Sequence, residues 1–193
     1  DAPAGDCVVY WMISARRTEW NHGLQHAIEM ANMRNMPLVV IEPLGINHKW
    51  ANDRMYTFMI QGMVDNKNSF EYSPITYIPY VESKLGEARG LLENWMDFAD
   101  LIVVDDFPVY HPRKVLEKAI ALNKCEVHCV DSNGFISLRG AGRHFTTAYS
   151  LRRHLQKTIT THLLESPHPS PLTLAEDLPT IDDSLVSKIF AIS

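Results

Sequence analysis

The stretch CVVYWMISARRTEWNHGLQHAIEMANMR, residues 7–34, decides the fold that the sequence predicts. Residues 7–12 form an apolar run that is too short for a helix and typical of a strand covered on both faces. A polar turn with Arg16 and Arg17 follows, and from Trp20 onward apolar residues recur at helical spacing. Strand, turn and helix make half of a β-α-β unit, whose ligand crevice lies where the strand ends. We therefore expect residues 11–18 to form part of any site.

The remaining chain repeats this alternation of buried strands and amphipathic helices. We expect further strands at 38–41, 75–80, 101–104 and 126–130, and helices that start near residues 20, 52, 88, 112 and 147. We interpret Glu42 and Pro43 as the end of the second strand and residues 65–73 as a polar turn. Five strands alternating with helices predict an α/β fold with a doubly wound, five-stranded, mostly parallel, Rossmann-like sheet.

The composition sets the domain boundaries that we expect. Residues 1–164 are predicted to form the α/β domain, and residues 165–193 a linker and an extended C-terminal tail. The run SPHPSP at 166–171 is typical of an extended linker. The acidic stretch after it is too short for a second core, so it either wraps the first domain or begins a further one.

A basic segment precedes the linker. Residues 132–164 contain no Asp or Glu, and within them we expect a helix from residue 147 that turns a row of apolar residues inward: Ala148, Leu151, Leu155, Ile159 and Leu163. Arg152 and Arg153 lie in this helix. The segment either faces an anion, a partner domain or a nucleic-acid backbone, or it is a solvated helix face.

Charge and cysteine content limit the classes of function. A net charge of -5 excludes a general attraction to nucleic acid. Three cysteines, an odd number, indicate a reducing and therefore cytoplasmic location without disulfides. No apolar run approaches the ~20 residues of a membrane span, and we expect no membrane contact. His22 and His26 lie one helical turn apart but lack the rest of a zinc motif, so we expect no metal site.

Motifs for phosphate binding, dinucleotide binding and nucleophilic catalysis are absent, and we expect no catalytic residue. What remains is a crevice at the ends of the first two strands, closed by the turn after Asp105. The residues predicted to line it are Trp11, Met12, Ile13, Ser14, Arg16, Glu42, Arg54 and Phe107. An apolar floor with charged edges suits a flat aromatic ligand with an anionic tail. Core packing is the alternative role of Trp11 and Met12, and helix capping is the alternative role of acids that end strands.

Several motifs resemble class II cyclobutane pyrimidine dimer photolyases, and they occur in the family's order. They are VVYWM (8–12) with the arginine turn and Asn21 after it, YTFMIQGMV (56–64), LIVVDDFP (101–108), VDSNGFI (130–136) and YSLRRHL (149–155). The turn itself departs from the family's Arg-Asp-Gln-Arg, because Ser14 and Ala15 replace its first residues. The resemblance covers residues 7–164 and points to the N-terminal domain of the photolyase and cryptochrome family.

The resemblance implies a light-driven DNA-repair protein in two parts. The N-terminal α/β domain of such a protein can hold an antenna pigment, a deazaflavin or a folate. A C-terminal helical domain binds FAD, contacts DNA and would be the partner of this domain in cis or in trans. We expect that FAD domain to be missing from this chain, so the chain itself would at most bind the pigment.

Two other functions stay open at this point. One is a scaffold without pigment, whose basic segment docks onto a helical partner. The other is a nucleotide-binding α/β domain. The turn 14–17 contains no glycine that would let the backbone approach a phosphate, which disfavours this last alternative.

Overall fold

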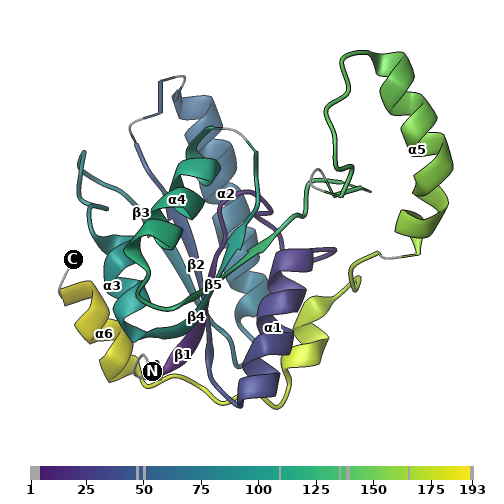
Figure 1. Ribbon diagram of the computed structural model, residues 1–193. Coiled ribbons are helices and arrows are strands. Elements are labelled where there is room, and N and C mark those ends of the chain that lie inside the picture. The colour runs from purple at the N-terminus through teal and green to yellow at the C-terminus, as the bar shows by residue number, and fades with distance from the viewer. Residues whose placement is uncertain are drawn as a thin grey trace.

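The computed structural model describes residues 5–46, 48–49, 51–108, 110–134, 136–137, 140–164 and 166–191. A five-stranded sheet lies at its centre, with strand order β3-β2-β1-β4-β5 (Figure 1). The strands are β1 (Cys7–Trp11), β2 (Leu38–Leu44), β3 (Thr76–Val81), β4 (Ala99–Asp105) and β5 (Glu126–Val130). Every neighbouring pair is parallel. The predicted α/β fold class is confirmed.

Helices cover both faces of this sheet. The elements are α1 (His22–Arg34), α2 (Asp53–Phe70), α3 (Leu91–Phe98), α4 (Tyr110–Leu122), α5 (Ala148–Leu163), the 3-10 helix η1 (Pro171–Ala175) and α6 (Asp183–Ala191). Residues of α1, α2 and η1 pack on one face, and residues of α3, α4 and α6 pack on the other. The sheet is therefore doubly wound, as the sequence predicts.

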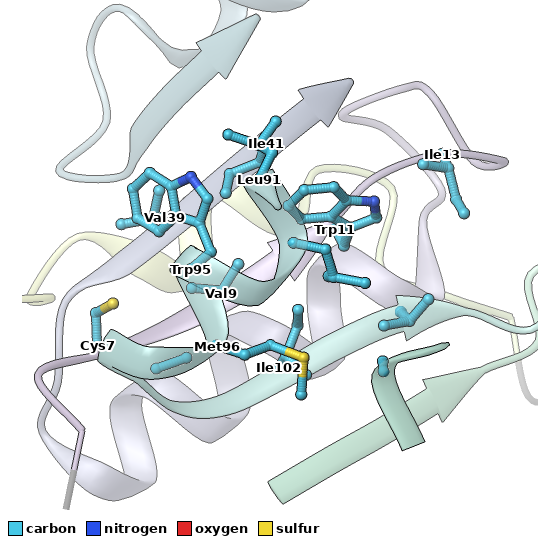
Figure 2. Close-up of a cluster of buried hydrophobic side chains, with 14 of the residues drawn as sticks. Cys7, Val9, Trp11, Ile13, Val39, Ile41, Leu91, Trp95, Met96 and Ile102 are labelled. Carbon is cyan, nitrogen blue, oxygen red and sulfur yellow. The ribbon is translucent and has the colours of Figure 1, made fainter. Parts of the chain in front are cut away.

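Strand β1 divides the core into two clusters because its successive side chains point to opposite faces. Cys7, Val9 and Trp11 join the cluster beneath α3, where Trp95 has no exposed surface (Figure 2). Val8, Tyr10 and Met12 belong to the cluster beneath α1. All five β1 residues are buried, which is why the strand reads as a continuous apolar run.

The main differences between the predicted and the observed element boundaries concern β2, α2 and α3. Glu42 and Pro43 lie inside β2, which runs on to Leu44 beside β3. Residues 65–70 continue α2, because Asn66 and Phe70 follow Met63 on the buried side of that helix. Phe70 also stacks on Tyr77, with ring centroids 4.8 Å apart. The helix predicted from residue 88 begins at Leu91.

Helix α5 and the C-terminal tail lie differently with respect to the sheet. Helix α5 buries none of its residues and stands away from the sheet, so its predicted inward face is wrong (Figure 1). The tail returns to the domain: Ala175 and Leu178 enter the core beneath α1, and Ile181 enters the core beneath α3. The tail therefore packs against the α/β domain.

Candidate functional site

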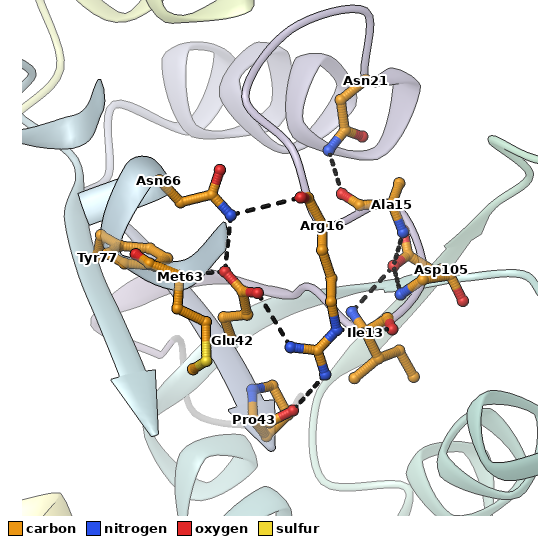
Figure 3. A network of polar contacts seen from close by, with 11 residues as sticks. Ile13, Ala15, Arg16, Asn21, Glu42, Pro43, Met63, Asn66, Tyr77 and Asp105 are labelled. Carbon is orange, nitrogen blue, oxygen red and sulfur yellow. Dashed lines mark hydrogen bonds and ion pairs between the residues drawn. The ribbon is translucent and has the colours of Figure 1, made fainter. Parts of the chain in front are cut away.

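The turn after β1 is held by one carboxylate at the end of β4. Asp105 Oδ2 accepts hydrogen bonds from the backbone N–H groups of Ile13, Ser14 and Ala15, at 3.0, 2.7 and 3.1 Å (Figure 3). Its Oδ1 accepts a bond of 2.8 Å from the hydroxyl of Tyr10. Burial and the negative charge of Asp105 raise the pKa of Tyr10, so the phenol stays neutral and remains a donor.

Asn21 fixes the other end of the same turn. Its Oδ1 caps α1 by accepting from Leu24 N at 3.0 Å, and its Nδ2 donates to Ala15 O and Arg17 O at 2.9 and 2.8 Å. The side chain has no exposed surface. The turn therefore enters α1 in one defined conformation, between a helix cap and a strand end.

Arg16 connects this turn to β2 and α2. Its guanidinium donates to Glu42 Oε1 at 3.0 Å and to Pro43 O at 2.5 Å (Figure 3). Asn66 Nδ2 and the Tyr77 hydroxyl donate to Glu42 Oε2, at 2.8 and 2.5 Å. Burial, followed by the hydrogen bond to Glu42, raises the pKa of Tyr77. A buried carboxylate needs such partners, because an unpaired one would pay a large desolvation penalty.

Basic groups converge on this edge. The pKa of His111, at the start of α4, is lowered first by desolvation and then by the positive charges of Arg16, Lys114 and His48. These residues come from the turn after β1, from α4 and from the loop after β2. The positive charges of Arg16, Lys114 and His48 therefore act on His111 at the carboxyl edge of the sheet.

The predicted site residues divide by exposure. Trp11, Met12 and Ile13 are buried in the core, and core packing is the alternative role that the sequence left open for Trp11 and Met12. Glu42 is buried within its network, with 1% of its surface exposed. A second group lies nearer the surface: Ser14, Arg16, Arg54 and Phe107. Arg54 is in the first turn of α2, and Phe107 follows β4, so both occupy the carboxyl edge.

The sequence reasoning missed Asn66 and Tyr77 as partners of Glu42, and treated Asp105 only as one of several strand-ending acids. Asn66 was assigned to a turn, although it follows Met59 and Met63 at helical spacing. That spacing was the available signal. No sequence signal pointed to a polar role for Tyr77, since an aromatic residue in a strand is ordinarily a packing residue.

Two other structural findings limit the chemistry of the described residues. Among them, no three His, Cys, Asp or Glu side chains are arranged to hold a metal ion. No helix in the described part of the chain has the length and apolar character needed to cross a bilayer.

Comparison with known proteins identifies relatives of this domain. No protein-family model matches the chain. A deoxyribodipyrimidine photo-lyase from Methanothermobacter thermautotrophicus is 43% identical over 158 residues, which are 79% of this chain and 35% of that protein. A deoxyribodipyrimidine photo-lyase from Arabidopsis thaliana is 25% identical over 192 residues, or 94% of this chain and 38% of that protein.

The fold thus defines a Rossmann-like α/β domain. Its sequence is homologous to the N-terminal α/β domain of deoxyribodipyrimidine photolyases, and the chain spans little more than a third of the length of these relatives. Among solved structures, two universal stress proteins, one in complex with cAMP and one from Archaeoglobus fulgidus in complex with dAMP, superpose with TM-scores of 0.41 and 0.42. They are 15% and 16% identical over 67% and 66% of this chain and 99% of theirs, and this likeness carries no argument about the site.

Proposed function

We propose that this chain is the antenna domain of a photolyase-type protein that repairs DNA with light. In this proposal a deazaflavin or folate pigment binds at the carboxyl edge of the sheet. Ser14, Arg16, Arg54 and Phe107 contact it, over a floor that contains Trp11, Met12 and Ile13. FAD and DNA bind to a helical domain that is a separate part of the protein, and the location is cytoplasmic.

The observation that carries the proposal is the convergence of cationic side chains on a rigid turn. Arg16, Lys114 and His48 all lower the pKa of His111, so their charges act on one region of the edge. The Ser14 hydroxyl beside them is buried and has no hydrogen-bond partner among the described residues. An anionic pigment would supply the missing partner of this hydroxyl, since a buried hydroxyl is costly without one.

Antenna function also accounts for the side chains at this edge. Passing on absorbed light requires a pigment ring in a fixed orientation, and it requires no nucleophile or general base on the protein. The turn is held in place by hydrogen bonds to Asp105, Asn21 and Glu42. Such preorganisation lowers the cost of ordering the turn when a ligand binds.

Titration with pigment tests the proposal. An 8-hydroxy-5-deazaflavin and a methenyl-folate are each added to the purified chain, and the absorption spectrum is followed. We expect a saturable red shift with one of them and weaker binding by Arg54→Gln. Lys67→Gln is the matched control, because Lys67 is exposed in the last turn of the same helix. If neither pigment binds, or if both variants bind equally well, the proposed pigment site is wrong.

Helix α5 favours a second role, which is docking onto the helical domain. It buries no residue in the described structure, and its exposed side chains include Leu151, Arg152 and Arg153. Apolar side chains flanked by charge on an unburied helix are typical of an interface. We expect the double substitution Arg152→Glu and Arg153→Glu to weaken binding to the separately expressed helical domain. Lys118→Glu, on exposed α4 surface, should leave that binding unchanged.

A further inference from the structure

Strand β5 forms one edge of the sheet and is held there by little buried surface. It is the last strand in the order β3-β2-β1-β4-β5 and pairs with β4. None of its five residues is fully buried, and Val127 and Val130 are only partly buried against the two core clusters. Segments with few buried side chains are the parts of a fold that open most easily. The polar contacts between β5 and α1 therefore matter for keeping this strand in place.

A row of polar side chains joins β5 to α1. His26 Nε2 lies 2.8 Å from His128 Nδ1, and His128 Nε2 lies 2.8 Å from Glu126 Oε1. The other carboxylate oxygen of Glu126 accepts from Arg34 NH2 at 2.5 Å. Arg34 also forms an ion pair with Asp100 in β4. The row thus attaches α1 to the edge strand at two points, one in the middle of the helix and one at its end.

Protonation decides whether the two imidazoles attract or repel each other. Because a carboxylate only accepts, His128 Nε2 carries the hydrogen, and in the neutral pair His128 Nδ1 accepts from His26 Nε2–H. One added proton is tolerated, since an imidazolium can donate to a neutral imidazole. Two added protons set N–H donors against each other and place two positive charges at a contact of 2.8 Å. The doubly protonated pair therefore pushes β5 away from α1.

The other charged and titratable groups near this contact come from every element that packs around it. They are His22, Glu29 and Arg34 on α1, Glu126 and Cys129 on β5, Asp131 after β5, Asp100 on β4 and His168 in the linker. Among the carboxylates, Glu29 acts on His26 and opposes the effect of its imidazole neighbour. Glu126 touches the pair directly, but it shares its charge with Arg34.

The direction of the pKa shifts identifies the groups that change charge in mild acid. Burial and the neighbouring His128 lower the pKa of His26 below its ordinary value. The hydrogen bonds from Arg34 and His128 lower the pKa of Glu126, so this carboxylate stays charged where the imidazoles titrate. A fall from neutral pH into mild acid therefore adds positive charge to the pair and removes none of the negative charge of Glu126.

We infer that His26 and His128 form a proton-operated latch, which holds β5 to α1 at neutral pH and releases the strand in mild acid. Release frees the edge of β4 and loosens the segment that leads from β5 to α5, while β1, β2 and β3 stay paired. The latch is a regulatory device that goes beyond the antenna and docking functions, because it requires neither a pigment nor a partner domain.

Hydrogen exchange of backbone amides, followed by NMR on the purified chain at pH 7 and at about pH 5.5, tests the inference. Protection factors remove the direct effect of pH on the exchange chemistry. We expect the β5 amides that pair with β4 to lose about fivefold to tenfold in protection, because His26 takes up a proton when the strand opens. At both pH values they should stay about tenfold or more below the protection of β1, which reports unfolding of the whole domain.

His26→Gln tests whether the imidazole is responsible. The glutamine amide can still donate to His128 Nδ1 but takes up no proton, so the protection of β5 should change less than about twofold between the two pH values. His144→Gln, at an exposed position, is the control and should keep the full change. The latch is overturned if β5 in the unaltered chain is equally protected at both pH values or as protected as β1. A full loss of protection in His26→Gln would overturn it as well, and the comparisons on the unaltered chain stand without any variant.

Discussion

Asp105 fixes the turn after β1 through four hydrogen bonds. Three of its donors are consecutive backbone N–H groups, and the fourth is the hydroxyl of Tyr10. The carboxylate is only 1% exposed, so water does not compete for these bonds. At the scale of single residues, this acid decides the conformation in which Ser14 and Arg16 leave the sheet.

We expect Asp105→Asn to lower the free energy of unfolding by about 2–4 kcal/mol, because the amide cannot accept all the bonds of the carboxylate. Urea-induced unfolding measures the change. Asp65→Asn, on the exposed side of α2, should stay within about 0.5 kcal/mol of the unaltered chain. Equal stability of the two variants would show that the turn does not depend on Asp105.

Gly23 lets α1 approach β1 closely. A Cβ at this position would lie 2.8 Å from the Tyr10 hydroxyl, which Asp105 holds in place. We expect Gly23→Ala to destabilise the protein by about 1–3 kcal/mol. Gly62→Ala, within α2, has nothing within 4 Å of the added atom and should stabilise by roughly 0.5–1 kcal/mol. Thermal unfolding compares the two, and the same sign of change for both would contradict this account.

At the scale of elements, a pair of histidines connects α1 to the edge strand β5. His26 Nε2 lies 2.8 Å from His128 Nδ1, and His128 Nε2 lies 2.8 Å from Glu126 Oε1. Arg34, at the end of α1, also binds Glu126. One imidazole of the pair must be neutral to accept the proton of the other.

This pair makes stability dependent on pH. Burial, followed by the neighbouring His128, lowers the pKa of His26 below the ordinary histidine value of 6.5, against an opposing effect of Glu29. The unfolded chain therefore binds more protons near that pH than the folded one does, and the free energy of unfolding falls as the pH drops from 7 through 6.5. We expect His26→Gln to flatten this dependence in urea titrations between pH 7 and about 5.5. His144→Gln, at an exposed position, should leave it unchanged.

At the scale of the whole molecule, the C-terminal tail completes both layers of the core. Leu178 is 5% exposed beneath α1, and Ile181 is 9% exposed at the other cluster. His168 N also donates to Gln25 Oε1 at 2.8 Å, which ties the linker to α1. The tail is thus part of the folded domain, although its composition resembles a linker.

We expect removal of residues 166–193 to destabilise the domain by about 4 kcal/mol, since two large apolar side chains leave the core. The thermal unfolding temperature should fall by roughly 10 °C. Leu174→Ala serves as a control, because Leu174 is 39% exposed in η1 and its loss should matter little. An unchanged unfolding temperature after truncation would mean that the tail contributes nothing to the core.

The sequence by itself determined the sheet, its five strands and the position of the edge where a ligand would bind. Those features follow from the alternation of apolar runs and turns, and this alternation is visible in each local segment of the sequence. It also placed Asp105 at the end of β4 and Arg16 in the turn after β1 correctly, whereas Glu42 lies inside β2, which runs on to Leu44. The order of the motifs along the sequence was enough to predict the relation to photolyases.

Only the tertiary structure decided which of those residues reach the surface. Glu42 is withdrawn from the surface because Arg16, Asn66 and Tyr77, distant in sequence, all bind it. The sequence also did not determine that α5 is exposed and that the tail is buried. An amphipathic pattern shows that one face of a helix is apolar, but it does not show whether another element covers that face. The contact between His26 and His128 arises where α1 meets β5, and no local pattern in either element specifies it.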